Sequence, residues 1–152
     1  MFKDDNYQFT YLNHGAIANI GYTIDEMGKM TPLDIKPEYT FESFEELVRP
    51  LRDKSQEKVI FETMHKRKNG SLYPVEVHLQ LIEYEQKWQF VALILDITQR
   101  REAEEELDRY REHLEELVEN RTRELTEANE KLQELDLMKT MFIASMSHEL
   151  RT

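Results

Sequence analysis

The last 55 residues of this 152-residue chain, residues 98–152, contain no glycine and no proline. These two residue types most often interrupt helices, so the segment predicts one long, unbroken helix. All four glycines, all four prolines and thirteen of the fifteen aromatic residues lie before residue 91. The chain therefore divides into a turn-rich globular unit and a helical one, and the boundary lies near Asp96-Ile97-Thr98.

Composition excludes several classes of protein. The net charge is -11, from 20 basic and 31 acidic residues, so we expect no binding to nucleic acid or anionic lipid. The chain has no cysteine, which excludes disulfides, zinc–thiolate sites, thiol catalysis and cysteinyl–flavin photochemistry. The longest apolar run, residues 90–95, is far shorter than the roughly 20 residues that cross a membrane. We also expect no signal peptide, because the first residues show no charged segment followed by an apolar one. We expect a cytoplasmic chain with no membrane segment and no metal site.

The globular unit has the pattern of an α+β fold. Polar–apolar alternation or dense apolar runs predict strands at 8–13, 58–68, 72–82 and 88–97, and helical spacing predicts helices at 14–22, 24–30 and 41–51. Asn69-Gly70 predicts a hairpin turn, and Pro74 favours an edge strand or a bulge because it cannot donate to a ladder. The apolar run at 88–97 is expected at the centre of the sheet. The element order predicts an antiparallel sheet with the helices on one side.

Several segments of this unit resemble a PAS domain: FTYLN (9–13), Gly21-Tyr22, PLDI (32–35), KNGSLYPVEV (68–77) and ALILDIT (92–98). These segments have the order and spacing of the family, and the resemblance spans about the first 98 residues. The family normally has a full strand before FTYLN, which only residues 1–5 could supply here, so we expect a truncated first strand. The resemblance implies a sensor domain at 1–97. It also implies that Asp96, Ile97 and Thr98 transmit the signal into the following helix, which Asp96 or Thr98 can cap.

PAS domains often enclose a ligand between the helices and the sheet. The candidate cavity residues are apolar, and simple core is the commoner role for each: Phe9, Tyr11, Ile17, Phe44, Val48, Phe61, Val77 and Leu93. Haem-binding members use a histidine of the long helix, and residues 41–54 contain none, so haem is not expected. Non-covalent flavin stays open, and the sequence does not identify the ligand.

The helical segment carries a narrow apolar seam with the spacing of a coiled coil: Leu107, Tyr110, Leu114, Val118, Leu125, Ala128, Leu132 and Leu135. The eleven-residue step from Leu107 to Val118 relaxes the left-handed supercoil. A long helix with one seam needs a partner, and identical seams face each other in a parallel homodimer. We therefore expect a dimeric coiled coil over 98–137. Arg121, on the seam, either fixes the register or extends its charge to solvent.

Residues 142–152 read FIASMSHELRT and resemble the phospho-acceptor box of sensor histidine kinases. This box opens their dimerisation and histidine-phosphotransfer domain, here 138–152. A solvent-facing imidazole is a nucleophile near pH 7, and the adjacent Glu149 can act as its general base. The resemblance implies that His148 accepts the phosphoryl group and that Thr152 orients water when the response regulator is dephosphorylated.

The chain contains no glycine-rich nucleotide box. The resemblance to sensor histidine kinases implies that ATP and magnesium bind to a separate catalytic domain, and we expect no autophosphorylation by this chain alone. The sequence predicts the sensor and signal-transmission part of a two-component histidine kinase. Its expected partners are a second copy of the chain, the ATP-binding domain and a response regulator. Two alternatives stay open: a PAS dimerisation or binding module without a kinase role, and a structural coiled-coil protein with a globular head.

Overall fold

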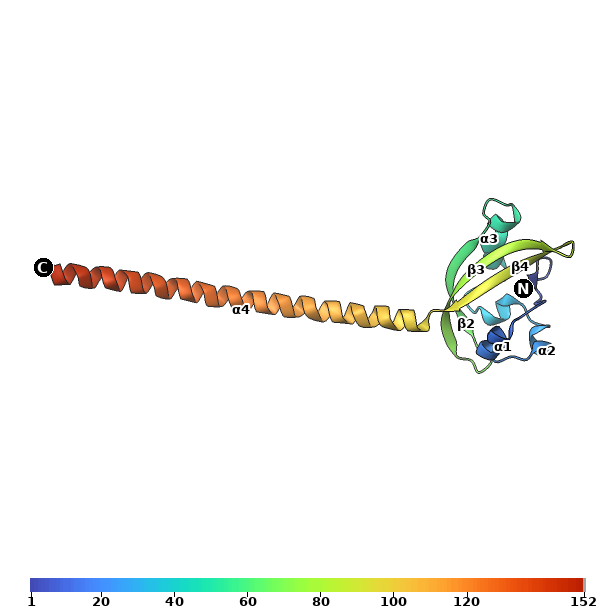
Figure 1. The fold of residues 1–152 in the computed structure, drawn as a ribbon, viewed down its shortest axis with the longest axis horizontal. Helices are drawn as coiled ribbons and strands as arrows, with labels where there is room; N and C mark the ends of the chain where they lie inside the picture. The colour runs from blue at the N-terminus through green and yellow to red at the C-terminus, as the bar shows by residue number, and fades with distance from the viewer. Residues whose placement is uncertain (152) are drawn as a thin grey trace. The chain divides into compact units, whose positions relative to one another are not determined.

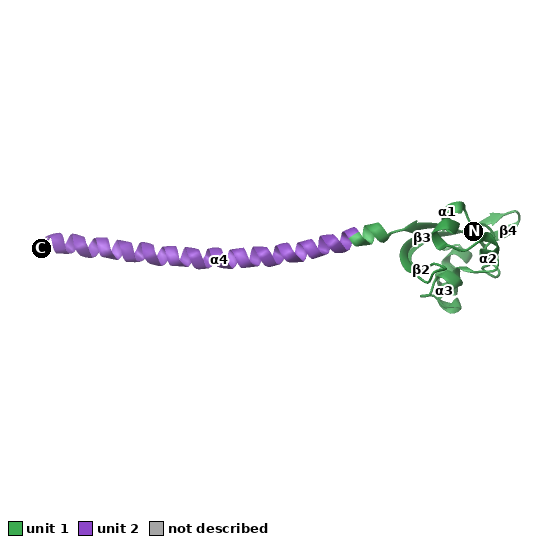
Figure 2. Ribbon diagram, turned by 90° about the horizontal axis from the view of Figure 1, so that it is seen from below, with its two compact units in different colours: residues 1–102 green, residues 103–152 purple. Residues whose placement is uncertain are grey.

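The computed structural model describes residues 1–151, and the chain forms two units, residues 1–102 and residues 103–152 (Figure 2). The first unit is an α+β domain (Figure 1). Its sheet has four antiparallel strands in the order β1-β4-β3-β2. The strands are β1 (Phe2–Lys3), β2 (Val59–Lys66), β3 (Leu72–Tyr84) and β4 (Lys87–Asp96).

The three long strands follow one another as hairpins, as the sequence predicts. Val77 of β3 faces Phe61 of β2 on one side and Ile94 of β4 on the other. The turn between β2 and β3 is longer than a two-residue turn, and within it Gly70 has the positive φ of 86°. β4 is an inner strand, which confirms its expected central position.

The helices cover one face of this sheet. They are α1 (His14–Ile20), α2 (Ile24–Met27), the 3₁₀ helix η1 (Pro32–Ile35) and α3 (Phe41–Arg52). Inward residues of β3 alternate with outward ones along the strand, and the inward set is buried against α3. Together they form the main core: Tyr73, Val75, Val77 and Leu79 of β3 with Phe44, Val48 and Leu51 of α3.

The short helices begin at side-chain caps. Asn13 accepts a hydrogen bond from the backbone N–H of Ala16, and Thr23 forms a capping box with Glu26. Gly21 ends α1 in the left-handed conformation, with φ 83°, which costs glycine little because it has no Cβ. These caps fix the segment that lies over the sheet between β1 and α3.

Two strand expectations are wrong. Residues 8–13 do not form a strand: Phe9 makes one isolated bridge to Phe2, while the N–H groups of Thr10 and Tyr11 both donate to the carbonyl of Met1. The backbone donors of this segment therefore bond to the first residue of the chain and not to a long neighbouring strand. Pro74 does not mark an edge strand either, because β3 lies between β2 and β4. The sheet tolerates Pro74 because β4 ends at Asp96, opposite Val75, so no residue of β4 needs a hydrogen bond from the nitrogen of Pro74. On its other side Pro74 pairs with Met64 of β2.

The second unit consists of helix α4, which begins at Thr98 in the first unit and ends at Arg151. No residue of α4 within this range is buried in the single chain. Among residues 1–151, no helix is both long enough and apolar enough to cross a bilayer.

Candidate functional site: a cavity and its connection to helix α4

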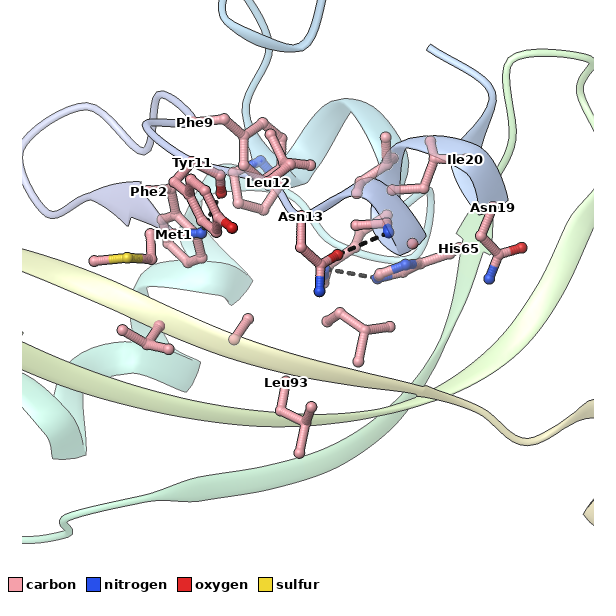
Figure 3. Close-up of a pocket in the computed structure, with 18 of the residues that line it drawn as sticks. Met1, Phe2, Phe9, Tyr11, Leu12, Asn13, Asn19, Ile20, His65 and Leu93 are labelled. Carbon is pink, nitrogen blue, oxygen red and sulfur yellow. Dashed lines mark hydrogen bonds between the residues drawn. The ribbon is translucent and has the colours of Figure 1, made fainter. Parts of the chain in front are cut away.

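A cavity of about 440 Å³ lies between the sheet and the segment that carries α1 and η1 (Figure 3). Most of its wall is apolar, including Phe9, Leu12, Ile20 and Ala92. Ligand cavities in proteins typically have volumes of roughly 300–1,000 Å³ and few polar groups. The size and lining of this cavity therefore fit a small organic molecule.

Two buried polar side chains lie in the wall. Lys36 follows η1 and is 4% exposed, and His65 of β2 is 1% exposed. The Nζ atom of Lys36 lies 2.8 Å from Nε2 of His65. Burial lowers the pKa of Lys36 to about 7. Burial, assisted by the Lys36 charge, lowers the pKa of His65 to about 3, so the imidazole is neutral at physiological pH.

Lys36 and His65 are absent from the predicted set of cavity residues. For His65 a signal exists, since alternation along β2 places it on the same face as Phe61 and Thr63. Lys36 has no comparable signal. A lysine between a 3₁₀ helix and Pro37 is ordinarily a surface residue.

The structure places only some of the predicted cavity residues in the cavity wall. Phe9 and Tyr11 line the cavity, whereas five others, Phe44, Val48, Val77, Phe61 and Ile17, are core or partly buried residues outside its wall. Leu93 reaches the cavity only through its position on β4. Its side chain lies on the opposite face of the sheet (Figure 3) and is 57% exposed. The prediction for the Leu93 side chain is therefore wrong, because its neighbours Ala92 and Ile94 face the core.

Asp96 connects the sheet to the first turn of α4. Its Oδ1 accepts hydrogen bonds from the backbone N–H of Thr98 (3.0 Å) and from the Thr98 hydroxyl (2.6 Å). The hydrogen bonds from Thr98 also hold the pKa of Asp96 below its ordinary value. Ile97, between them, is 4% exposed.

Arg67 links this junction to the wall of the cavity. Its guanidinium donates to the carbonyl of Asn19 at the end of α1 (3.0 Å) and lies 3.7 Å from the ring centre of Tyr73. It also lies 3.6 Å from Oδ2 of Asp96. Asn19 and Tyr73 both line the cavity, so one side chain contacts the cavity wall and the junction.

A second connection lies on the open face of the sheet, where the register places Glu62 beside Glu76. Arg100 of α4 binds both carboxylates, at 2.6 and 3.1 Å, and Arg101 binds Glu62 at 2.7 Å. This cluster is absent from the predicted sites. The signal is two acidic residues on paired strands and two arginines just after Thr98.

The seam residues of α4 are exposed in the single chain: Leu107, Tyr110, Leu114, Val118, Leu125, Ala128, Leu132 and Leu135. Arg121 on the seam binds Glu124 at 2.7 Å, one turn along the same helix. His148 and Glu149 are exposed in the last turns of α4. Thr152 lies outside the described residues.

Comparison with known proteins identifies the first unit. The family model of the PAS domain matches residues 1–99. Three similar solved structures each align with 62% of this chain. A PAS domain from a two-component sensor histidine kinase has 22% identity, a TM-score of 0.52 and 79% of its own length covered. The PAS domain of an HTR-like protein from Haloarcula marismortui has 24% identity, a TM-score of 0.53 and 82% covered.

A PAS domain from Desulfitobacterium hafniense has 19% identity, a TM-score of 0.53 and 87% of its length covered. No curated protein sequence matches the chain. At these identities the solved structures establish a shared fold, while the family model covers well over half of the chain. The family match, the inner position of β4 and the helices over one face of the sheet lead to one conclusion: this chain belongs to the PAS domain family.

Proposed function

We propose that this chain is the sensor and signal-transmission part of a two-component histidine kinase. The observation that carries the proposal is the continuity of α4, which leaves the PAS sheet at Thr98 and contains His148 before it ends at Arg151. A change at the start of an unbroken helix can reach its far end as a rotation or a register shift. The similarity to a PAS domain from a sensor histidine kinase supports a sensory role.

A parallel homodimer gives the seam of α4 a partner. Leu107, Leu125 and Leu132 are 61–69% exposed in the single chain, although burial of a leucine side chain is worth about 1.5–3 kcal/mol. In a parallel dimer each seam residue packs against its own copy, so the whole seam is buried at once. The same arrangement brings two copies of His148 to the same level of the coiled coil.

The end of α4 has a broader apolar surface than its middle. Met141, Phe142 and Ile143 are each more than half exposed, and consecutive helical residues lie about 100° apart. Three consecutive apolar residues cannot share one narrow seam. They fit a segment that packs against more than one further helix. Sensor histidine kinases, which this segment resembles, have such packing in their dimerisation and histidine-phosphotransfer domain.

Two contacts connect the PAS domain to the start of α4, and the proposed signal travels through the first of them. Arg67 contacts both Asn19 of the cavity wall and Asp96, and Asp96 accepts the hydrogen bonds that start α4. Arg100 and the carboxylate of Glu62 form a separate contact between the open face of the sheet and the first turn. A ligand that moves the end of α1 changes the first of these contacts and not the second. The start of α4 can therefore tilt or rotate about the Arg100 contact.

His148 is the proposed phospho-acceptor. One imidazole nitrogen attacks the γ-phosphorus of ATP, so an N–P bond forms while the P–O bond to ADP breaks. Glu149 takes the proton from the other ring nitrogen and makes the attacking nitrogen more nucleophilic. ATP and magnesium come with the catalytic domain. Thr152 is proposed to orient the water that later dephosphorylates the response regulator.

The test adds a separate ATP-binding domain, which supplies the kinase activity. The chain is incubated with the ATP-binding domain of a histidine kinase that has a matching acceptor box, together with magnesium and γ-labelled ATP. We expect label that is stable in base and lost in acid. His148→Ala should abolish it, while His113→Ala, at another exposed histidine of α4, should retain it.

Absence of label, or label that survives in His148→Ala, would contradict the kinase role. The chain would then be a PAS dimerisation or binding module whose last residues only resemble the acceptor box. The observation that favours this second function is the exposed seam itself, which requires a partner whether or not His148 is phosphorylated.

A further inference from the structure

The cavity of the PAS domain combines a large apolar wall with one concentrated polar region. Phe9, Leu12 and Ile20 belong to the apolar wall, while Lys36 and His65 lie together in the polar region. A ligand that fills about 440 Å³ of such a space needs an apolar body and a polar group at one end. The chemistry of Lys36 and His65 decides what that group is.

These two side chains offer donors and no negative charge. Within residues 1–151, the hydrogen-bond partner of the Lys36 Nζ is Nε2 of His65, and no carboxylate forms an ion pair with Lys36. When Nζ donates to Nε2, the imidazole proton lies on Nδ1. The buried Nδ1 atom has no hydrogen-bond partner among the described residues. The polar region therefore lacks an acceptor and a counter-charge for a buried ammonium group.

We propose that the cavity binds a small organic monocarboxylic acid with an apolar body, and that its carboxylate lies beside Lys36 and His65. This inference rests on the sensing role proposed above and deepens it, since it names the class of ligand. The carboxylate accepts hydrogen bonds from the Lys36 ammonium and supplies the charge that the wall lacks. A shift of the His65 ring brings its N–H donor within reach of the same group.

A monoanion fits this region better than a phosphate group. Lys36 is the one cation in the described lining apart from the chain's amino group, and a buried dianion would leave one charge uncompensated. A neutral ligand would leave the Lys36 ammonium without a counter-ion. Asn19 and Tyr73 also line the cavity and contact Arg67. An occupant of the cavity therefore touches the side chains that lead to Asp96.

The experiment compares two probes of the same shape, 3-phenylpropanoate and its neutral amide, 3-phenylpropanamide. Binding to the full chain is measured by calorimetry at pH 7, and by shifts of backbone amide resonances at the cavity. We expect the acid to bind at least about tenfold tighter than the amide. Lys36→Met should remove this preference, while Lys29→Met, at an exposed lysine of the same domain, should preserve it.

Equal affinity for acid and amide would overturn the proposal, and so would an acid preference that persists in Lys36→Met. No detectable binding of the acid at about 5 mM, equivalent to less than roughly 3 kcal/mol, would overturn it as well. Circular dichroism checks that Lys36→Met is folded, and Lys36→Gln serves as a second neutral variant. Binding is read without a kinase, so a negative result here leaves the labelling of His148 standing, and the reverse also holds.

Discussion

Replacing Lys36 by methionine should change how the stability of the PAS domain depends on pH. Burial lowers the pKa of folded Lys36 from its ordinary value of 10.5 to about 7. Between these two values the unfolded chain binds a proton that the folded chain does not. The free energy of unfolding therefore rises with pH across this window, and the cost of burying the ammonium is largest below pH 7. Methionine has a similar length and no charge, so this dependence should disappear.

The magnitude follows from the pKa shift. One pKa unit corresponds to about 1.4 kcal/mol, so the shift to about 7 corresponds to about 5 kcal/mol over the full window. Folded Lys36 is about half protonated at pH 7, so the rise from pH 7 to pH 9 is about 2 kcal/mol. The absolute stability of Lys36→Met is less informative, because the variant also leaves Nε2 of His65 without its donor, at a cost of about 1–3 kcal/mol.

Urea unfolding followed by the fluorescence of Trp88 measures this quantity, since Trp88 is the single tryptophan and lies in β4. Wild type and Lys36→Met are compared at pH 7, 8 and 9 and at equal protein concentration. The groups nearest to Lys36 do not titrate in this range: burial lowers the pKa of His65 to about 3 and raises that of Tyr73. Other titrating groups are common to both proteins and cancel. Parallel curves for the two proteins would refute the reasoning.

Two further predictions concern assembly and signalling. Leu114→Lys combined with Leu132→Lys should convert a dimer of twice 18.3 kDa into a monomer by light scattering, because each lysine would be buried against its own copy; an unchanged mass would exclude the seam as the interface. In the assay with the added kinase domain, Asp96→Ala should change labelling of His148 several-fold, the effect of about 1–3 kcal/mol of coupling. Its melting temperature should fall by only a few degrees, since one capping interaction is lost. Unchanged labelling would leave Asp96 as an ordinary cap, and a large fall in melting temperature would make it a core-stability residue.

The sequence predicts well those elements whose pattern depends on one buried face. Along β3, alternation marks Tyr73, Val75, Val77 and Leu79 as inward residues, and all are buried. The segment FTYLN alternates in a similar way but forms no strand, because Phe9 finds only an isolated bridge to Phe2. Alternation reports which face of a segment is apolar, whereas a strand also needs a neighbouring backbone to pair with.

The cavity could be predicted only in part. The run WQFVALILDI is apolar at consecutive positions, so the sequence does not say which residues of β4 face the core. Pairing with β3 decides this, and places Leu93 opposite His78 on the open face. Lys36 is not predicted, for another reason. Its burial depends on contact with His65 of β2, which lies 29 residues away in the sequence. No local pattern marks a lysine that tertiary packing removes from water.

In the sequence, Pro74 favours an edge strand or a bulge, but in the structure it lies on an inner strand, at the end of the pairing between β3 and β4. The register of β3 and β4 places Pro74 opposite Ile97, where an antiparallel pair would exchange two hydrogen bonds. The N–H of Ile97 donates to the carbonyl of Pro74 at 3.1 Å, but Pro74 has no N–H to return. The carbonyl of Ile97 instead accepts from the N–H of Arg101 at 2.9 Å, which is the first hydrogen bond of α4. Any other residue at position 74 would offer a competing donor. Proline therefore ends the ladder at the residue where the strand becomes the helix, which is the junction through which the proposed signal would enter α4.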